Sequence, residues 1–281
     1  MGARGLQWYV ERQPDAEAAP YVACLGMQHV SPAGAPYPHR IVPNGCAELA
    51  YQLGSGRVVV VGPRRIPRVG FLAPDTTIVG LRFRPGAASG ILGVPATELV
   101  GMEIDLAEIW GVAAEELVTR LEEAQSPAQT SFLLERAVAE RARRARPVDP
   151  LVAQAAAHLR VHLSEPVQAL SSALYVSPRH LRRRLVASLG YGPKTLQRVL
   201  RFQAALALAG TSALGQLGFG RLSRLLGYAD QPHFSRECVA FTGLAPNRFF
   251  SELAATCGPS HDHTASYAEV RRAMFASARA A

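Results

Sequence analysis

The strongest constraint on the fold is one pattern that occurs twice near the C-terminus, 53 residues apart. The first copy runs from Tyr175 through His180 and Arg183 to a Gly-x-x-Pro end, and the second copy repeats it from Tyr228. A repeat at a fixed period indicates that one supersecondary unit occurs twice. The pattern therefore predicts two small helical units, each ending in a short helix that carries an arginine.

Each copy has the signals of a capped amphipathic helix. Ser177 is a natural N-cap and Pro178 suits the first helical position, so the first helix should run to about Ser188. Asp230 caps the second. The expected inner residues are Leu181, Leu185 and Leu189 in the first helix and Phe234, Cys238 and Phe241 in the second, which leaves Arg179, Arg182 and Arg183, and Pro232, Ser235 and Arg236, outside.

The segments around these helices predict two helix-turn-helix units. Residues 167–175 and 222–226 are apolar and precede the two helices, a geometry that lays the second helix in the major groove of DNA. Residues 193–209 carry Leu or Ala at every fourth position from Leu196 to Leu208, which predicts an amphipathic helix that links the two units. At about 1.5 Å per residue it would be roughly 25 Å long. That length would hold two reading helices near one duplex turn, roughly 34 Å, apart.

The distribution of charge agrees with DNA binding. The chain has 30 basic and 22 acidic residues, a formal net charge of +8, and residues 151–253 alone hold 12 basic and 4 acidic residues, also +8. A phosphate-binding footprint concentrates positive charge in this way. Arginine can bind guanine through two parallel bonds, so Arg179, Arg183 and Arg236 are candidates for base contacts, and Arg184, Lys194, Arg198 and Arg201 are candidates for phosphate contacts.

These residues strongly resemble the AraC family of bacterial transcription regulators. The resemblance covers residues 151–253 and rests on the motifs Val176-Ser177-Pro178-Arg179-His180-Leu181-Arg182-Arg183, Gly190-Tyr191-Gly192-Pro193, Leu226 to Arg236 and Thr242-Gly243-Leu244-Ala245-Pro246. It implies two helix-turn-helix units joined by a long helix, with base contacts from Arg179, Arg182, Arg183, Gln231, Ser235 and Arg236. Three positions depart from the family pattern. Tyr175 stands where the first turn usually has glycine, Ser223 where the second unit usually has alanine, and Pro232 where a polar side chain often reads DNA.

The N-terminal part predicts a different architecture. Short β-prone runs at 21–30, 47–53, 58–61 and 78–83 are separated by Pro and Gly turns, which is typical of a small antiparallel sheet or barrel. Short helical pieces follow at 87–92, 96–100, 106–110 and 114–124, and a helix at 132–146 is interpreted as the connection between domains. The expected fold class is α+β: a β-rich domain with short helices (1–127), a helical linker (128–150), an all-α double helix-turn-helix domain (151–253) and a partly disordered tail (254–281).

Residues 20–124 resemble the uncharacterised sensor-like domain that precedes this DNA-binding domain in many actinobacterial members. The motifs Arg40 to Leu49, Gly80 to Ala87 and Leu92 to Pro95 carry the likeness. A turn at 43–45 places Cys46 and Glu48 on one side of a strand, and Arg82 and Arg84 share a side of another. Either an arginine pairs with Glu48 inside the sheet, or Cys46, Glu48, Arg82 and Arg84 form a pocket for an acidic or carbonyl ligand.

Other site classes find little support in the sequence. Cys24, His29, His39 and Cys46 lack the short spacing of a zinc site, and Cys257, His261 and His263 lie in the tail, so no metal or other cofactor is predicted. No catalytic arrangement is recognisable, so an enzyme is not expected. Two alternatives to a regulator stay open. One is a DNA-repair alkyl acceptor using a cysteine such as Cys46, although the neighbouring Glu48 opposes a reactive thiol. The other is an architectural DNA-bending protein.

The sequence therefore predicts a regulator that binds double-stranded promoter DNA through residues 151–253. Its activity would be modulated by a small-molecule effector or by homodimerisation through residues 1–127, with RNA polymerase as a partner if it activates transcription. No stretch of about 18 apolar residues is present, which argues against a membrane span, and four cysteines without close pairing are typical of a reducing cytoplasm.

Overall fold

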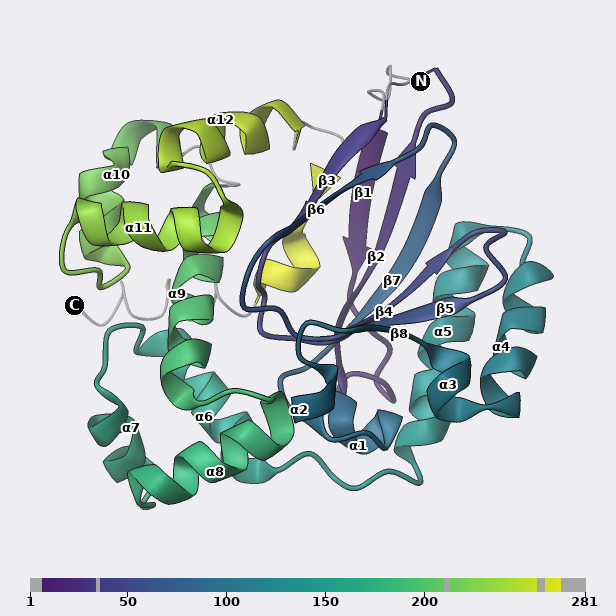
Figure 1. The fold of residues 1–281 in the computed structure, drawn as a ribbon, viewed down its shortest axis with the longest axis horizontal. Helices are drawn as coiled ribbons and strands as arrows, with labels where there is room; N and C mark the ends of the chain where they lie inside the picture. The colour runs from purple at the N-terminus through teal and green to yellow at the C-terminus, as the bar shows by residue number, and fades with distance from the viewer. Residues whose placement is uncertain (1–6, 34–35, 210–212, 257–260, 269–281) are drawn as a thin grey trace.

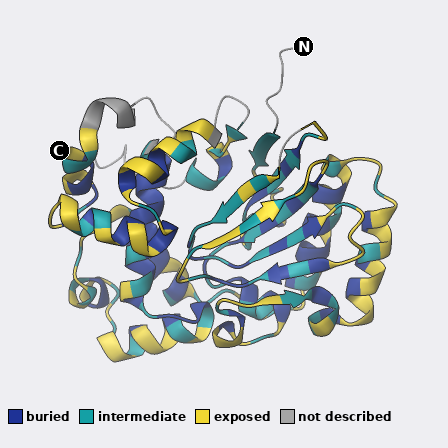
Figure 2. Ribbon diagram, turned by 45° about the horizontal axis from the view of Figure 1, so that its top comes forward, coloured by how far each residue is buried: buried dark blue, intermediate teal, exposed yellow. Residues whose placement is uncertain are grey.

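The computed structural model describes residues 7–33, 36–209, 213–256 and 261–268. Two hydrophobic cores organise these residues, one under the N-terminal sheet and one among the C-terminal helices (Figure 1). Figure 2 shows buried residues along the central strands and on the inner faces of the helices, with exposed residues on the outer helix faces. The α+β fold class predicted from the sequence is confirmed.

The N-terminal part is built on an open seven-stranded sheet. Its strands are β1 (Gln7–Arg12), β2 (Val22–Val30), β4 (Glu48–Gln52), β5 (Val58–Val61), β7 (Thr77–Phe83), β8 (Glu103–Asp105) and β9 (His261–Asp262), in the order β8-β5-β4-β7-β2-β1-β9. All neighbours are antiparallel except β9, which runs parallel to β1. A separate two-stranded ribbon, β3 (Tyr37–Ile41) with β6 (Arg68–Leu72), extends towards the C-terminal helices (Figure 1).

The four strands predicted from the sequence are confirmed as β2, β4, β5 and β7. They carry alternating buried residues, the period-two pattern from which strands are recognised. β1, β3, β6, β8 and β9 were not predicted. β1 and β6 lack this alternation of fully buried residues, and β8 and β9 span only three and two residues, so they give no periodic signal.

Five helices accompany the sheet: α1 (Ala88–Leu92), α2 (Ala96–Leu99), α3 (Leu106–Trp110), α4 (Val112–Glu122) and α5 (Pro127–Ala142). All five were predicted within a few residues. α5, however, does not stand between two units as the sequence interpretation placed it. It packs against β2 and β7 and buries Leu134 and Val138 in the sheet core, and its buried Glu135 pairs with Arg12 of β1 at 2.7 Å. This helix is therefore part of the N-terminal layer.

The described residues between 150 and 256 form seven helices: α6 (Pro150–Val161), α7 (Val167–Ala173), α8 (Pro178–Leu189), α9 (Pro193–Ala209), α10 (Ala213–Leu225), α11 (Gln231–Thr242) and α12 (Pro246–Thr256). α7 with α8 and α10 with α11 form two helix-turn-helix units, and α9 joins them (Figure 1). α9 has the bounds that were predicted from the apolar residues at every fourth position. α10 is interrupted at Gly218, whose backbone is not helical, so its second half is the helix predicted near 222–226.

The two units differ in their turns, although the sequence pattern aligns Tyr175 with Tyr228. Tyr175 has φ 53° and is 95% exposed, whereas Tyr228 is 4% exposed and packs edge-on against Phe234. The residue of the second turn with the same left-handed backbone is Gly227, at φ 74°. The tyrosines are thus not equivalent. The second turn has one more residue before its cap, and Tyr175 occupies the position that favours glycine.

Candidate nucleic-acid interface

α8 is a capped helix with one apolar and one basic side. The Ser177 side chain accepts from the backbone N–H of His180 at 3.2 Å, and Pro178 stands at the first position. The apolar side is fully packed, with Leu181, Leu185 and Leu189 each at most 2% exposed. Burying each leucine contributes roughly 1.5 to 3 kcal/mol, so this side fixes the orientation of the helix.

The basic side of α8 faces solvent, as predicted. Arg179, Arg182 and Arg183 are all exposed. Arg183 lies 3.3 Å from His180 Nδ1, one turn back on the same helix, and this contact orients the guanidinium. Because the described part of the chain leaves these three arginines exposed, they are available to a partner molecule.

α11 repeats the arrangement with a less basic outer side. Asp230 caps it by accepting from the N–H of His233 at 2.6 Å, and Phe234, Cys238 and Phe241 are at most 2% exposed, as predicted. Gln231 and Arg236 are exposed and Ser235 is half-buried. These three side chains border a groove of about 490 Å³ whose other walls are Phe219, Val239, Ala245, Pro246 and Asn247.

The residues predicted to contact phosphate fall into three situations. Lys194 is exposed at the start of α9. Arg184 donates to Asp149 at 2.6 Å and keeps an exposed side chain. Arg198 donates to the buried Glu237 of α11 at 2.6 Å while its guanidinium lies 5.3 Å from the Phe241 ring, so part of this side chain ties α9 to the second recognition helix. For these three residues, phosphate contact stays a prediction.

The phosphate prediction is wrong for Arg201. This residue is only 8% exposed, and its Nε and Nη2 both donate to the carbonyl of Leu163, at 3.1 and 2.9 Å. Its guanidinium also lies 5.0 Å from the Tyr228 ring. The sequence placed Arg201 on the linking helix of a basic domain, but the loop between α6 and α7 folds over α9 and encloses it. Arg201 is therefore a packing residue.

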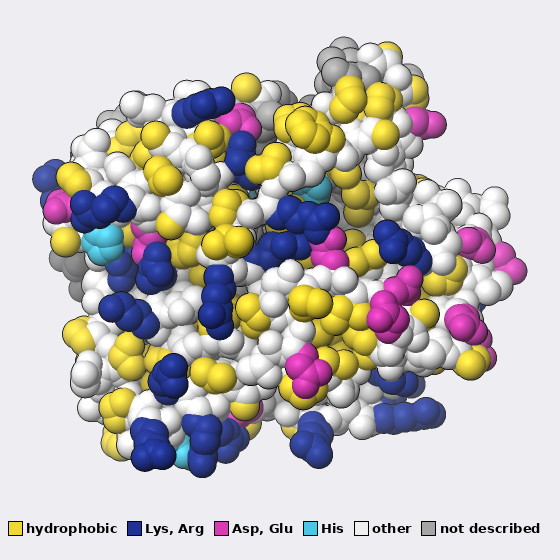
Figure 3. Space-filling model, viewed as in Figure 1, with side chains coloured by type: hydrophobic (Ala, Val, Ile, Leu, Met, Phe, Trp, Pro, Cys, Tyr) yellow, Lys and Arg dark blue, Asp and Glu magenta, His cyan; other side chains and the backbone are white. Residues whose placement is uncertain are grey.

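Basic side chains gather on one part of the surface. Figure 3 shows Lys and Arg along the side of the molecule occupied by the C-terminal helices, from α11 to α8, while acidic side chains are more frequent over the N-terminal part. This distribution fits the excess of basic residues in 151–253. Local charge of one sign attracts the phosphate backbone and raises the rate of encounter with DNA.

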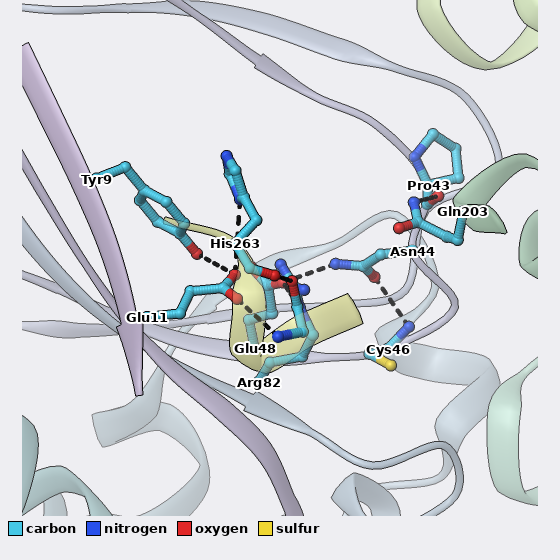
Figure 4. A network of polar contacts seen from close by, with 10 residues as sticks. Tyr9, Glu11, Pro43, Asn44, Cys46, Glu48, Arg82, Gln203 and His263 are labelled. Atoms are coloured by element: carbon cyan, nitrogen blue, oxygen red, sulfur yellow. Dashed lines mark hydrogen bonds and ion pairs between the residues drawn. The ribbon is translucent and has the colours of Figure 1, made fainter. Parts of the chain in front are cut away.

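Three of the tentative ligand residues, Cys46, Glu48 and Arg82, belong to one network of polar contacts on the sheet (Figure 4). Arg82 Nε donates to Glu48 Oε1 at 2.7 Å, and Asn44 donates to the same oxygen at 2.7 Å. The Cys46 N–H donates to Asn44 at 3.0 Å. The predicted pairing of an arginine with Glu48 is confirmed for Arg82. Arg84 lies apart, donating to the Ala19 carbonyl at 2.6 Å.

The C-terminal segment covers this network on the sheet. Tyr9 donates to Glu11 at 2.7 Å, the Ser266 N–H donates to the other carboxylate oxygen at 2.7 Å, and His263 stacks on Tyr9 with ring centroids 4.6 Å apart. Burial raises the pKa of Glu11, but the contacts with His263, Arg82, Ser266 and Tyr9 outweigh it and lower that pKa to about 2. Residues 261–268 of the expected tail are thus packed onto the sheet, and Cys257 lies outside the described residues.

Two of the described cysteines, Cys24 and Cys238, hold buried thiols that do not suit an alkyl acceptor. Burial raises the pKa of the Cys24 thiol to about 12 and that of Cys238 to about 11, so both stay protonated. Cys46 is half-buried beside Asn44 and lies next to Glu48 in the sheet network. These observations weigh against the alkyl-acceptor alternative.

Two contacts between the N-terminal part and the recognition helices were not predicted from the sequence. Arg65 donates from Nη2 to the carbonyl of Gly190 at the end of α8, at 2.9 Å. Arg40 donates from Nη1 to the carbonyl of Thr242 at the end of α11, at 2.7 Å. Each partner lies more than a hundred residues away in the chain, so no local pattern could have signalled either contact.

Comparison with known proteins agrees with these units. A family model described as a helix-turn-helix domain matches residues 170–252, and a model described as a domain of unknown function, DUF6597, matches residues 10–105. No curated protein sequence matches the chain. Solved structures of ToxT from Vibrio cholerae are weakly similar. One from strain O395 is 10% identical, covers 88% of this chain and 97% of its own, and has a TM-score of 0.45. An unsaturated fatty-acid-bound form is 12% identical, covers 89% and 96%, and has a TM-score of 0.44.

The paired helix-turn-helix units and their basic surface define a DNA-binding protein. The chain carries a helix-turn-helix domain at residues 170–252, preceded by a DUF6597 domain at residues 10–105. Among the described residues, no helix combines the length and apolarity needed to cross a bilayer.

Proposed function

We propose that α8 and α11 enter successive segments of one major-groove face of a promoter, and that the N-terminal domain modulates this binding. In this assignment Arg179, Arg182 and Arg183 read bases from α8, and Gln231, Ser235 and Arg236 read bases from α11. Lys194, Arg184 and the exposed part of Arg198 contact phosphates.

One observation carries the proposal. Two capped helices of 12 residues each stand at opposite ends of α9, and each buries one apolar side and exposes the other. The 17 residues of α9 span roughly 25 Å, which is compatible with helices placed about one duplex turn apart. Packed inner faces fix the direction in which the outer side chains point, and base readout requires that rigidity.

Modulation by the N-terminal domain is supported by its contacts with both recognition helices. Arg65 and Arg40 each donate to a carbonyl at the C-terminal end of one helix, where the helix dipole favours a positive charge. Arg40 also pairs with Glu252 of α12 at 3.1 Å. Between the two helices, Gln203 of α9 donates to the Pro43 carbonyl at 2.8 Å. A shift of the sheet domain would therefore change the spacing of the two helices.

The first recognition helix is held especially closely. α2 packs against α8, and a side chain at Gly190 would meet Val100 at 2.2 Å and the Ala96 carbonyl at 2.7 Å. Gly190 also has φ 77°, so this position needs glycine for its backbone as well as for the approach. The end of α8 is thus a rigid joint between the two parts of the protein.

A cavity between the two parts is the proposed effector site. It measures about 410 Å³ and is lined mainly by small apolar residues of the α6 region, with Arg84 from the sheet side and Arg160 from α6. A volume of this size suits a small organic ligand. Two guanidinium groups on apolar walls favour a molecule with an acidic group and an apolar body. Of the tentative ligand residues only Arg84 lines this cavity, while its Nε donates to the Ala19 carbonyl, so only Arg84 is retained here.

The proposal is tested by selecting duplexes from a random pool with the full chain and sequencing the bound fraction. We expect two conserved blocks separated by about one helical turn. Enrichment without sequence preference would contradict base reading and favour the architectural alternative. For the effector, a panel of apolar acids is screened for a rise in Tm that is absent in Arg84→Ala. A panel with no such ligand would remove the effector site while leaving the DNA assignment intact.

A further inference from the structure

Three metal-ligating side chains meet at the end of α6. His158 and His162 are one helical turn apart, and Glu165 follows in the loop to α7. One ligand atom from each lies within 4.8 Å of the others, and His158 Nε2 contacts Glu165 Oε2 directly. The two imidazole rings have centroids 4.4 Å apart. Three donors from one short segment are therefore already gathered at one point.

The donor set indicates the class of ion. Two imidazoles and one carboxylate suit divalent ions of intermediate softness, and zinc sites with three protein ligands keep a fourth position for water or another ligand. The His158 and Glu165 side chains are 21% and 25% exposed and His162 is exposed, so the ion has a path from solvent. The sequence analysis considered other cysteines and histidines as metal ligands and did not include these three residues. Their signal was the spacing His-x3-His-x2-Glu.

The loop that carries Glu165 leads into the first helix-turn-helix unit and contacts both α9 and the turn of the second unit. The Leu163 carbonyl accepts from Arg201 of α9, and the Glu165 carbonyl accepts from Gln197 of α9 at 2.6 Å. Ser164 packs against the second turn so closely that a side chain at Gly227 would lie 2.4 Å from its Cβ. The loop is thus the point where the first unit, the linking helix and the second turn meet.

We propose that His158, His162 and Glu165 bind a zinc-like divalent ion that fixes the α6–α7 loop against α9 and the second turn. On binding, the ion takes a lone pair from a neutral imidazole nitrogen of each histidine and from the carboxylate, and any proton on these groups is released to solvent. The ion stabilises the folded form because an unfolded chain does not hold the three ligands together.

The test uses the full chain without an affinity tag, after removal of metals by a chelator. Co²⁺ is titrated first, because its visible absorption reports the coordination number, and Zn²⁺ is then added to displace it. We expect a single site with four- or five-coordinate cobalt absorption that Zn²⁺ abolishes, and a Tm that rises with Zn²⁺ concentration. His162→Ala, a change at an exposed residue, should lower the affinity at least tenfold.

A matched variant separates this site from other histidines. His180→Ala, in α8 and outside the cluster, should bind cobalt as the unmodified protein does. Glu165→Gln keeps the shape of the loop while removing the anionic ligand, and it should also weaken binding. Equal cobalt affinity in His162→Ala and the unmodified protein, in samples with the same circular dichroism spectrum, would overturn the proposal. A six-coordinate cobalt spectrum unaffected by Glu165→Gln would do the same.

Discussion

Arg40 of strand β3, in the two-stranded ribbon, donates to the carbonyl of Thr242 at 2.7 Å, at the last residue of the second recognition helix. Arg65 makes the corresponding contact with Gly190 at the end of the first. A charged donor at a helix C-terminus satisfies a carbonyl that lacks a partner within the helix and interacts favourably with the dipole. The same domain therefore supports both reading helices near their C-terminal ends.

The two contacts give separable predictions for local dynamics. Arg40→Ala should speed amide hydrogen exchange at residues 239–244 and leave residues 186–191 unchanged, while Arg65→Ala should do the reverse. Loss of a charged hydrogen bond of this kind corresponds to about 1.5 to 3 kcal/mol of local stability. Exchange measured by mass spectrometry checks both variants in one experiment. Faster exchange at both helices in either variant would show that the contacts are not independent.

Arg183→Ala should lose base discrimination. We expect specific binding to weaken by about 1 to 3 kcal/mol and the preference at one base pair to relax, because the guanidinium on the exposed side of α8 is removed without disturbing its apolar side. Fluorescence anisotropy with the selected duplex and with single-base variants measures this. Arg57→Ala, at an exposed arginine of the N-terminal domain, serves as the control and should bind like the unmodified protein.

Substitutions of Lys194 and Arg201 should distinguish a residue that contacts phosphate from a residue that stabilises the fold. Lys194→Ala is expected to reduce the slope of log affinity against log salt by about one, since one phosphate contact is lost. Arg201→Ala should leave that slope unchanged and lower the free energy of unfolding by roughly 1.5 to 3 kcal/mol, because its two bonds to Leu163 are buried. A reduced slope for Arg201→Ala would restore the phosphate role that its burial argues against.

The exposed left-handed position in the first turn predicts a stabilising substitution. Tyr175→Gly should raise the free energy of unfolding by about 0.5 to 1 kcal/mol, because relief of a left-handed backbone at a non-glycine residue exceeds the added flexibility of the unfolded chain. Gly227→Ala, at the equivalent position of the second turn, should destabilise, since its Cβ would meet Ser164. Urea denaturation measures both. A destabilised Tyr175→Gly would mean that the ring makes contacts in solution.

The network around Glu11 predicts an acid dependence of stability. Its pKa is lowered from 4.5 to about 2 and its side chain is 1% exposed, so the folded state favours the ionised form. The contribution is present in full above about pH 4.5 and is lost as the pH falls towards 2. It is on the order of 3 kcal/mol by the pKa difference. The difference in unfolding free energy between Glu11→Gln and the unmodified protein should shrink over this range, and a constant difference would contradict the assignment.

Local patterns carried most of the C-terminal prediction. Caps at Ser177 and Asp230 and the apolar periodicity of α8, α9 and α11 determined their bounds, because those signals act within one or two turns of helix. The sheet was predicted only in its central strands. β1 and β9 lie at opposite ends of the chain yet pair at one edge, a relationship that no local spacing encodes.

Side chains of the candidate site could be predicted from the sequence where helix periodicity determines their exposure. They could not be predicted where segments distant in the chain come into contact. Arg201 stands about one turn after Arg198 on α9, but the α6–α7 loop encloses it. Arg40 and Arg65 depend on how the sheet docks against the helices, which only the three-dimensional arrangement defines.

The most direct test of the central claim, that two helices read successive turns of one duplex, is a base-by-base binding profile for Arg183→Ala and Arg236→Ala on the selected operator. The account predicts that each variant loses preference at a different position, with the two positions about 10 base pairs apart and on one face of the duplex. Loss of preference at the same position in both variants, or at neither, would contradict it.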